Sequence, residues 1–159
     1  MPRTALRHRV LPELRGALGQ DPAPALARVA RLLDEDEEAL AIWAAEVLVQ
    51  ARRGTTKGSQ DGLALDVAVL SAQPRAVRGR VVLAAWKELG EVGDGVALPP
   101  LSEVHVAALD QLVMNIGVPG APAPGAQTHL PGGWIAHRDA TSLAFTRLEG
   151  RGAAGKPSP

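Results

Sequence analysis

The feature that most constrains how this chain can fold is an apolar stripe at helical spacing between residues 25 and 53. Its members recur every three or four residues, the spacing that places side chains on one face of an α-helix. The stripe consists of Leu26, Val29, Leu33, Leu40, Trp43 and Val47. The pattern predicts one long helix from about Ala25 to Arg53, which follows a Pro-containing turn and carries an acidic run at 34–38.

A second helical pattern opens the chain. Its apolar positions are Leu6, Val10, Leu14 and Leu18. Thr4 can cap the start of this helix, and Gly19 is typical of a helix end. Because Pro12 has no backbone N–H, we expect it to kink the helix or to mark its restart. Arg7 falls among the apolar positions, so its side chain must reach solvent, form an ion pair or face a partner.

Two more helices are predicted further along the chain. Pro74 suits the first position of a helix over Arg75–Leu89, and Gly90 is typical of its end. Ser102 can cap a fourth helix over residues 103–115. The long helix and the third helix are separated by a polar, Gly-rich loop at 54–62 and by residues 63–70. The period of residues 63–70 fits either an extended segment or a helical turn.

The character of the sequence changes after Gly117, where short apolar runs alternate with turn residues. The pattern predicts strands at 129–130, 134–138 and 142–147, with a turn at 131–133. The fold class is therefore mostly α, with about four helices and a small C-terminal β-hairpin or three-stranded unit. As domains we expect a helical part at 1–117, a linker at 118–125, the β unit at 126–148 and a disordered tail at 149–159.

Composition excludes several classes of function. The chain has no Cys, which rules out disulfides, thiol catalysis and Cys-ligated zinc. It has three Trp, one Phe and no Tyr, too few aromatic residues for a platform on which bases stack. No apolar run approaches the roughly 18 residues of a membrane span. The four His are spread along the sequence, and none has a partner at helical metal-ligand spacing.

The features that suggest a function are basic, although the formal net charge is zero. Arg3, Arg7, His8 and Arg9 gather around the first helix, and Arg75, Arg78 and Arg80 lie at the start of the third. Arginine is the residue best suited to bidentate contact with phosphates. The alternative interpretation of both groups is a solvated helix face. From these residues alone, RNA binding and ordinary solvation both stay open.

The opening sequence resembles a known family. Residues 3–14 read Arg-Thr-Ala-Leu-Arg-His-Arg-Val-Leu-Pro-Glu-Leu. This stretch resembles the segment that follows the catalytic domain in tRNA(Ile)-lysidine synthases. The matching positions are Arg3, Arg7, His8, Leu11, Pro12 and Leu14, whereas Thr4 replaces the usual Asn. Residues 25–36, 73–86 and 130–134 are similar to later blocks of the same family, in the same order. The resemblance covers the chain from Arg3 to about Phe145.

The resemblance implies a specific role. Members of this family use ATP to attach lysine to the wobble cytidine of an isoleucine tRNA. Their catalytic residues lie in an N-terminal domain with a Ser-Gly-Gly-x-Asp-Ser loop, and these 159 residues contain no such loop. We therefore expect no catalytic residue, cofactor or metal in this chain, with ATP and Mg²⁺ confined to that separate domain. Whether the chain itself counts as an enzyme is left open.

The expected role is contact with tRNA(Ile) and support of the N-terminal catalytic domain, in the cytoplasm and with no membrane partner. The expected tRNA-binding residues are Arg3, Arg7, His8, Arg9, Arg78 and Arg80. A surface that normally meets the catalytic domain could also pair with a second copy, giving a homodimer. The competing hypothesis is a stand-alone helical protein-interaction module that binds no RNA. An autonomous hydrolase or transferase has no supporting set of residues.

Overall fold

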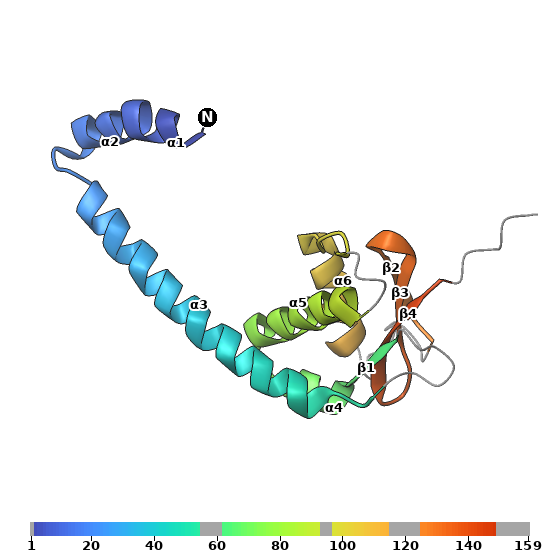
Figure 1. Cartoon of the computed structure of the whole chain (residues 1–159). Coiled ribbons are helices and arrows are strands. Elements are labelled where there is room, and N and C mark those ends of the chain that lie inside the picture. Colours follow the sequence, from blue (N-terminus) through green and yellow to red (C-terminus); the bar gives the residue numbers. More distant parts are fainter. Residues whose placement is uncertain (1, 55–61, 93–96, 115–124, 149–159) are drawn as a thin grey trace, which may run out of the picture. The chain divides into compact units, whose positions relative to one another are not determined.

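The computed structural model describes residues 2–54, 62–92, 97–114 and 125–148, with the side chains of Pro2, Arg3 and Val92 left out. It confirms a mostly helical chain with a small sheet near its C-terminal end (Figure 1). The chain forms two compact units, Met1–Ala39 and Leu40–Pro159. Helix α3 contributes to both units, and each unit is described in turn.

The first unit begins with three consecutive helical segments, α1 (Pro2–Ala5), the π-helical turn η1 (Leu6–Val10) and α2 (Leu11–Leu18). In η1 the Leu11 N–H donates to the Leu6 carbonyl, five residues back. The wider turn lies directly before Pro12, whose ring would collide with the carbonyl four residues earlier in a regular α-helix. The predicted irregularity at Pro12 is therefore confirmed.

The ends of this first helical run were predicted with mixed success. Gly19 adopts a left-handed conformation with φ of 67°, and its N–H donates to the Arg15 carbonyl at 3.0 Å, so it ends α2 as predicted. The prediction that Thr4 caps the helix is wrong, because α1 begins at Pro2 and Thr4 lies inside it.

Helix α3 (Ala23–Ala51) is the predicted long helix, displaced by two residues at each end. Its two halves differ in burial. Ala44, Val47, Leu48 and Ala51 belong to the core of the second unit, whereas Leu26, Val29 and Leu33 are each more than half exposed. The apolar stripe that predicted the helix is therefore a core face only in its C-terminal part.

The second unit adds β1 (Leu63–Asp66), α4 (Val67–Ser71), α5 (Arg75–Val92) and α6 (Glu103–Met114). The ambiguous stretch at 63–70 contains both predicted alternatives, a strand followed by a helical turn. The predicted helix end at Gly90 is wrong, because α5 continues through it to Val92. Gly90 is buried, and a Cβ there would lie 3.2 Å from the Leu98 backbone nitrogen, so the glycine permits close packing.

The C-terminal strands are β2 (Gln127–Leu130), β3 (Trp134–Arg138) and β4 (Ser142–Arg147), with a 3₁₀ turn η2 (Pro131–Gly133) inside the predicted hairpin. The sheet is antiparallel, in the order β1-β4-β3-β2. It has one strand more than predicted, because β1 pairs with β4 and places Leu65 opposite Leu143. Figure 1 shows α5 and α6 on one side of this sheet.

The core lies between the sheet, α5, α6 and the end of α3. Its largest fully buried side chain is that of Phe145 on β4. Trp86 of α5 and Trp134 of β3 meet edge to face, with ring centroids 5.9 Å apart. The predicted tail, 149–159, and the predicted linker, 118–125 apart from Gly125, lie outside the described residues. The predicted domain boundaries stay predictions.

Candidate nucleic-acid interface

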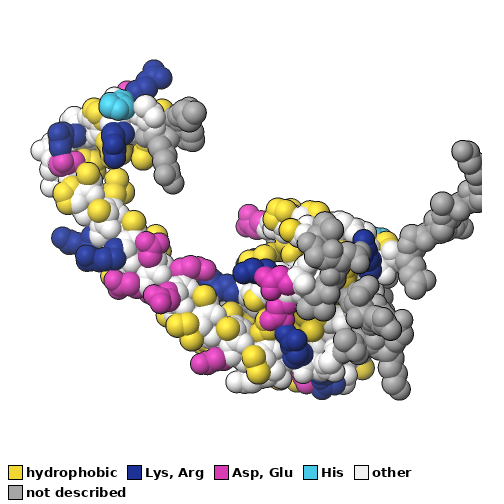
Figure 2. Space-filling view, viewed as in Figure 1, with side chains coloured by type: hydrophobic (Ala, Val, Ile, Leu, Met, Phe, Trp, Pro, Cys, Tyr) yellow, Lys and Arg dark blue, Asp and Glu magenta, His cyan; other side chains and the backbone are white. Residues whose placement is uncertain are grey.

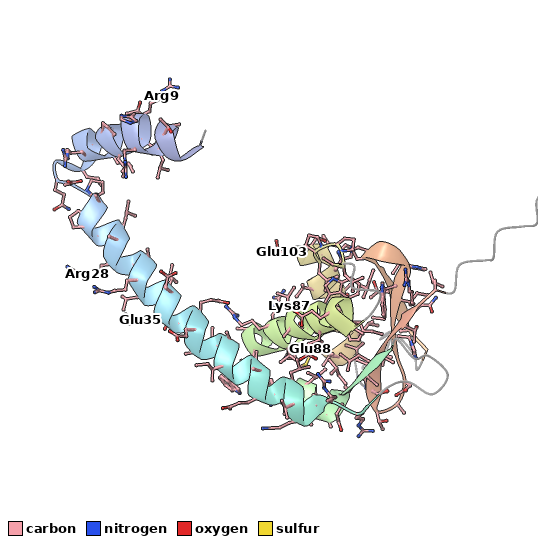
Figure 3. The ribbon with its side chains drawn as sticks, in the orientation of Figure 1. Arg9, Arg28, Glu35, Lys87, Glu88 and Glu103 are labelled. Atoms are coloured by element: carbon pink, nitrogen blue, oxygen red, sulfur yellow. The ribbon has the colours of Figure 1, made fainter. Side chains whose placement is uncertain are left out.

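The first unit carries exposed positive charge on η1. Arg7, His8 and Arg9 are consecutive in this turn, and all three are exposed (Figure 2). Arg9 projects outward from η1, and Arg28 projects outward from α3 (Figure 3). In the part of the chain that the structure describes, Arg7, Arg9 and Arg28 have no ion pair or hydrogen bond to their side chains. Their charge is therefore available to a partner.

Two open hollows adjoin this turn, and Arg7 lines both of them. The first has a volume of about 440 Å³ and also includes Thr4, His8 and two leucines. The second, of about 470 Å³, runs along α2 toward the turn before α3. A guanidinium beside an open hollow can reach an anionic group of a partner. Arg7 lies among apolar positions in the sequence, but its side chain is exposed and not part of a core.

Arg15 and Asp21 line the second hollow and neutralise each other. The Arg15 side chain pairs with the Asp21 carboxylate, which also accepts the Ala23 N–H at 3.2 Å. The Ala23 hydrogen bond, with help from Arg15, lowers the pKa of Asp21 below its usual value. Arg15 is therefore engaged within the unit, in contrast to Arg7 and Arg9.

The predicted residue Arg3 lies in α1, but its side chain is outside the described part of the structure. The first predicted group is therefore represented here by Arg7, His8 and Arg9. These three residues belong to one helical turn and lie close together, as the sequence predicted.

The second predicted group, at the start of α5, is divided by the fold. Arg78 is 8 % exposed, and its Nε donates to Asp110 Oδ1 at 2.6 Å while Nη1 donates to the Gln73 carbonyl at 2.6 Å. Arg80 is half-buried and donates to the Ala76 carbonyl at 2.9 Å. Arg75 is exposed. The charge of Arg78 is thus balanced inside the fold, and its predicted tRNA contact gains no support from its surroundings.

Two further arginines were not singled out from the sequence. Arg53 donates to Asp66 Oδ2 at 2.8 and 2.6 Å and to the Thr141 hydroxyl at 3.2 Å. Arg138 is buried and donates to the Leu112 and Val113 carbonyls, at the C-terminal end of α6. The alternation in β3 is a signal that could have found Arg138, since it shares the inward face of Trp134 and Ala136.

The remaining candidate features carry no site. His105 Nδ1 lies 2.9 Å from the Ser102 hydroxyl at the start of α6, where it helps to cap the helix. The described residues contain no group of three or more His, Asp or Glu side chains that could hold a metal ion. Among the described helices, none combines the length and apolar character needed to cross a membrane.

Comparison with known protein families shows which family this chain resembles. Residues 65–143, from β1 to β4, match the family model described as "TilS substrate binding domain". This chain belongs to the tRNA(Ile)-lysidine synthase family. The matched segment lies wholly in the second unit, whereas the exposed arginines of η1 lie in the first.

Relatives in this family match a longer part of the chain. The tRNA(Ile)-lysidine synthase of Thermobifida fusca is 38 % identical over an alignment of 129 residues, and the match covers 75 % of this chain and 35 % of the relative. That of Streptomyces coelicolor is 34 % identical over 143 residues, 90 % of this chain and 36 % of the relative. That of Salinispora tropica is 41 % identical over 132 residues. The chain spans about a third of the length of these relatives.

Proposed function

We propose that this chain is the part of a tRNA(Ile)-lysidine synthase that holds tRNA(Ile) while an active site elsewhere attaches lysine to its wobble cytidine. The observation that supports the proposal is the exposed, unneutralised charge of Arg7 and Arg9 within a chain of this family. The role would be performed in the cytoplasm, where family members generally act. His8 is exposed beside these arginines and would add a donor to the same surface.

The surface suits binding through the phosphate backbone. Guanidinium groups on a helix can each neutralise a phosphate, and the counterions that this releases make the affinity strongly salt-dependent. Stacking of bases would contribute little, because Trp86, Trp134 and Phe145 are buried in the core and one exposed indole, Trp43, makes no stacking platform. The affinity would therefore come mainly from charge, and selectivity would come from the shape of the tRNA.

A separate surface of the first unit would support the catalytic domain. Its leucines and valines on α2 and on the first part of α3 are between 38 % and 61 % exposed. They are Leu14, Leu18, Leu26, Val29, Leu32 and Leu33. Apolar side chains that stay exposed on two successive helices are typical of an interface. We assign this interface to the N-terminal catalytic domain, and a second copy of the chain is the competing occupant.

We assign no ATP or Mg²⁺ site to this chain. The sequence lacks the phosphate loop of the family's catalytic domain, and the described residues offer no set of metal ligands. ATP and Mg²⁺ would therefore be held by the catalytic domain. The residues of this chain would bind and orient the tRNA.

The test is a salt titration of tRNA(Ile) binding to the 159-residue chain and to its Arg7→Ala/Arg9→Ala variant. We expect the double variant to bind at least about tenfold more weakly at low salt, with a log–log salt slope smaller by about two. The matched control is Arg15→Ala/Arg31→Ala, which removes the same charge from arginines that already pair with Asp21 and Glu35. The control should bind nearly as well as the parent chain.

Two outcomes would contradict the proposal. In one, the parent chain shows no binding of tRNA(Ile) even at about 50 mM salt, where phosphate contacts are strong. In the other, both double variants lose the same affinity, so only net charge matters. If the chain fails to bind tRNA but forms a salt-resistant complex with the catalytic domain, it is a protein-docking module.

A further inference from the structure

The second unit contains a cluster in which two arginines share one carboxylate. Asp110 of α6 accepts a short hydrogen bond from Arg78 Nε, at 2.6 Å, while Arg75 Nε lies 3.8 Å from the other carboxylate oxygen. The Arg78 side chain is 10 % exposed and that of Arg75 is 77 % exposed. The cluster therefore carries one positive charge in excess, and that charge lies at the surface on Arg75.

Three other cations in the described part of this unit are each paired with one carboxylate. Arg52 pairs with Glu88, Arg53 with Asp66, and Lys87 with Glu91. Each of these carboxylates offsets the charge of its own partner. Asp110 differs, because it lies near two arginines. It accepts a hydrogen bond from Arg78, whereas Arg75 lies beyond hydrogen-bond distance of its other carboxylate oxygen.

The same geometry leaves the donors of Arg75 unused. Its side chain has no hydrogen bond in the part of the chain that the structure describes, so its guanidinium donors face solvent. The attraction of Asp110 still favours positions of Arg75 close to the start of α5, which limits the freedom lost on binding. A planar guanidinium held in this way suits a bidentate contact with a phosphate.

We propose that Arg75 is a phosphate-binding residue of the substrate-binding domain, that it contacts the RNA backbone, and that Asp110 and Arg78 position it. This inference rests on the proposed function, and it adds a contact inside the segment 65–143 that matches the family model. It also reassigns the basic group of α5, because the sequence favoured Arg78 and Arg80 whereas the fold leaves Arg75 exposed. Arg78 is a positioning residue, since it donates hydrogen bonds both to the Asp110 carboxylate and to the Gln73 carbonyl and so fixes the position of that carboxylate.

The experiment compares Arg75→Ala, Arg75→Lys and the parent chain in salt titrations with a tRNA(Ile) transcript. We expect Arg75→Ala to bind about threefold to tenfold more weakly at low salt and to lower the log–log salt slope by about one. Arg75→Lys keeps the charge but loses the fork of donors, so it should retain the slope and recover only part of the affinity. Thermal unfolding should be unchanged in both variants, because the side chain is exposed.

The matched control is Lys87→Ala, which removes one exposed charge from the same helix but from a residue paired with Glu91. It should bind like the parent chain. If Arg75→Ala and Lys87→Ala bind equally well, the inference about Arg75 is wrong, while the proposed function stands as long as Arg7→Ala/Arg9→Ala loses affinity. If the parent chain does not bind the transcript at all, the proposed function fails and this inference fails with it.

Discussion

At the scale of single residues, Asp66 joins three parts of the second unit. Its Oδ1 accepts the N–H groups of Ala68 and Val69, at 2.7 and 3.3 Å, and so caps α4. Its Oδ2 accepts two hydrogen bonds from the guanidinium of Arg53, which lies two residues after the end of α3. The Arg53 hydrogen bonds, and the two backbone N–H groups, hold the pKa of Asp66 below its usual value.

We predict that Asp66→Ala destabilises the chain by about 1–2 kcal/mol at pH 7, because it removes both the cap and the partner of Arg53. The folded pKa is lowered, so the contribution of the carboxylate is fully present above the usual pKa of 3.8 and is lost as the pH falls through the folded value. Urea unfolding at pH 7, 5 and 3 measures this contribution.

Asp66→Asn is the matched variant for that series. It can keep the cap on α4 but cannot keep the charged bond to Arg53. Its deficit in unfolding free energy relative to the parent should shrink between pH 5 and pH 3. A deficit that stays constant over this range would show that the ion pair with Arg53 contributes nothing.

The arginines show what the sequence could tell about the candidate site and what it could not. The cluster on η1 was predictable, because residues 7–9 are adjacent and one turn of helix keeps them together. The fate of Arg78 was not, because its partner Asp110 is 32 residues away and meets it only when α5 packs on α6. Composition and spacing contain no record of such distant neutralisation.

At the scale of elements, the local signals worked best. Pro12, Gly19 and the long apolar stripe act within a few residues, and they predicted the irregular turn, the end of α2 and helix α3. The sequence left β1 as one of two alternatives, because it is only four residues long and its partner β4 lies about 80 residues further along the chain. Gly90 was wrongly predicted to end α5, because its role is to allow close packing against Leu98, a contact that only the folded chain shows.

Two glycines of opposite role provide an element-scale prediction. Gly132, in the turn between β2 and β3, has φ of 72°, and a Cβ there would lie 3.4 Å from Pro99 Cδ. We predict that Gly132→Ala lowers the free energy of unfolding by about 1–2 kcal/mol, because an L side chain is strained at this φ. Chemical denaturation with the parent chain alongside measures the difference.

The control for Gly132 is Gly79→Ala on α5. Gly79 has ordinary helical φ, and a Cβ there would meet Val106 Cγ1 at 3.5 Å, a normal contact distance. This variant should be neutral or stabilising by up to about 1 kcal/mol, because alanine is the better helix former. Equal destabilisation by both substitutions would contradict the assignment of strain to the turn.

At the scale of the whole molecule, the two units differ in what stabilises them. The members of the hydrophobic core cluster all lie between Ala44 and Phe145, within the second unit. The first unit contributes helices whose apolar side chains are largely exposed. Since burial of apolar surface is the main source of stability, most of the unfolding free energy of the chain belongs to the second unit.

We predict that a shortened chain of residues 40–159 unfolds cooperatively, with a midpoint within about 5 °C of the full chain. The removed residues, 1–39, contain none of the core cluster. A chain of residues 52–159 is the contrasting variant, because it lacks Ala44, Val47, Leu48 and Ala51. It should lose the cooperative transition, and differential scanning calorimetry distinguishes the two. Loss of the transition in residues 40–159 would show that the first unit stabilises the second.

The edge-to-face contact of Trp86 with Trp134 makes this protein its own optical probe. With no Tyr in the chain, absorption near 280 nm comes almost entirely from three indoles, and two of them lie close enough, edge to face, for their excited states to couple. Acrylamide or iodide should reach only the third, Trp43, which is 42 % exposed on α3. Circular dichroism of the coupled pair would report melting of the core, and quenching of the lone indole would report events on the long helix.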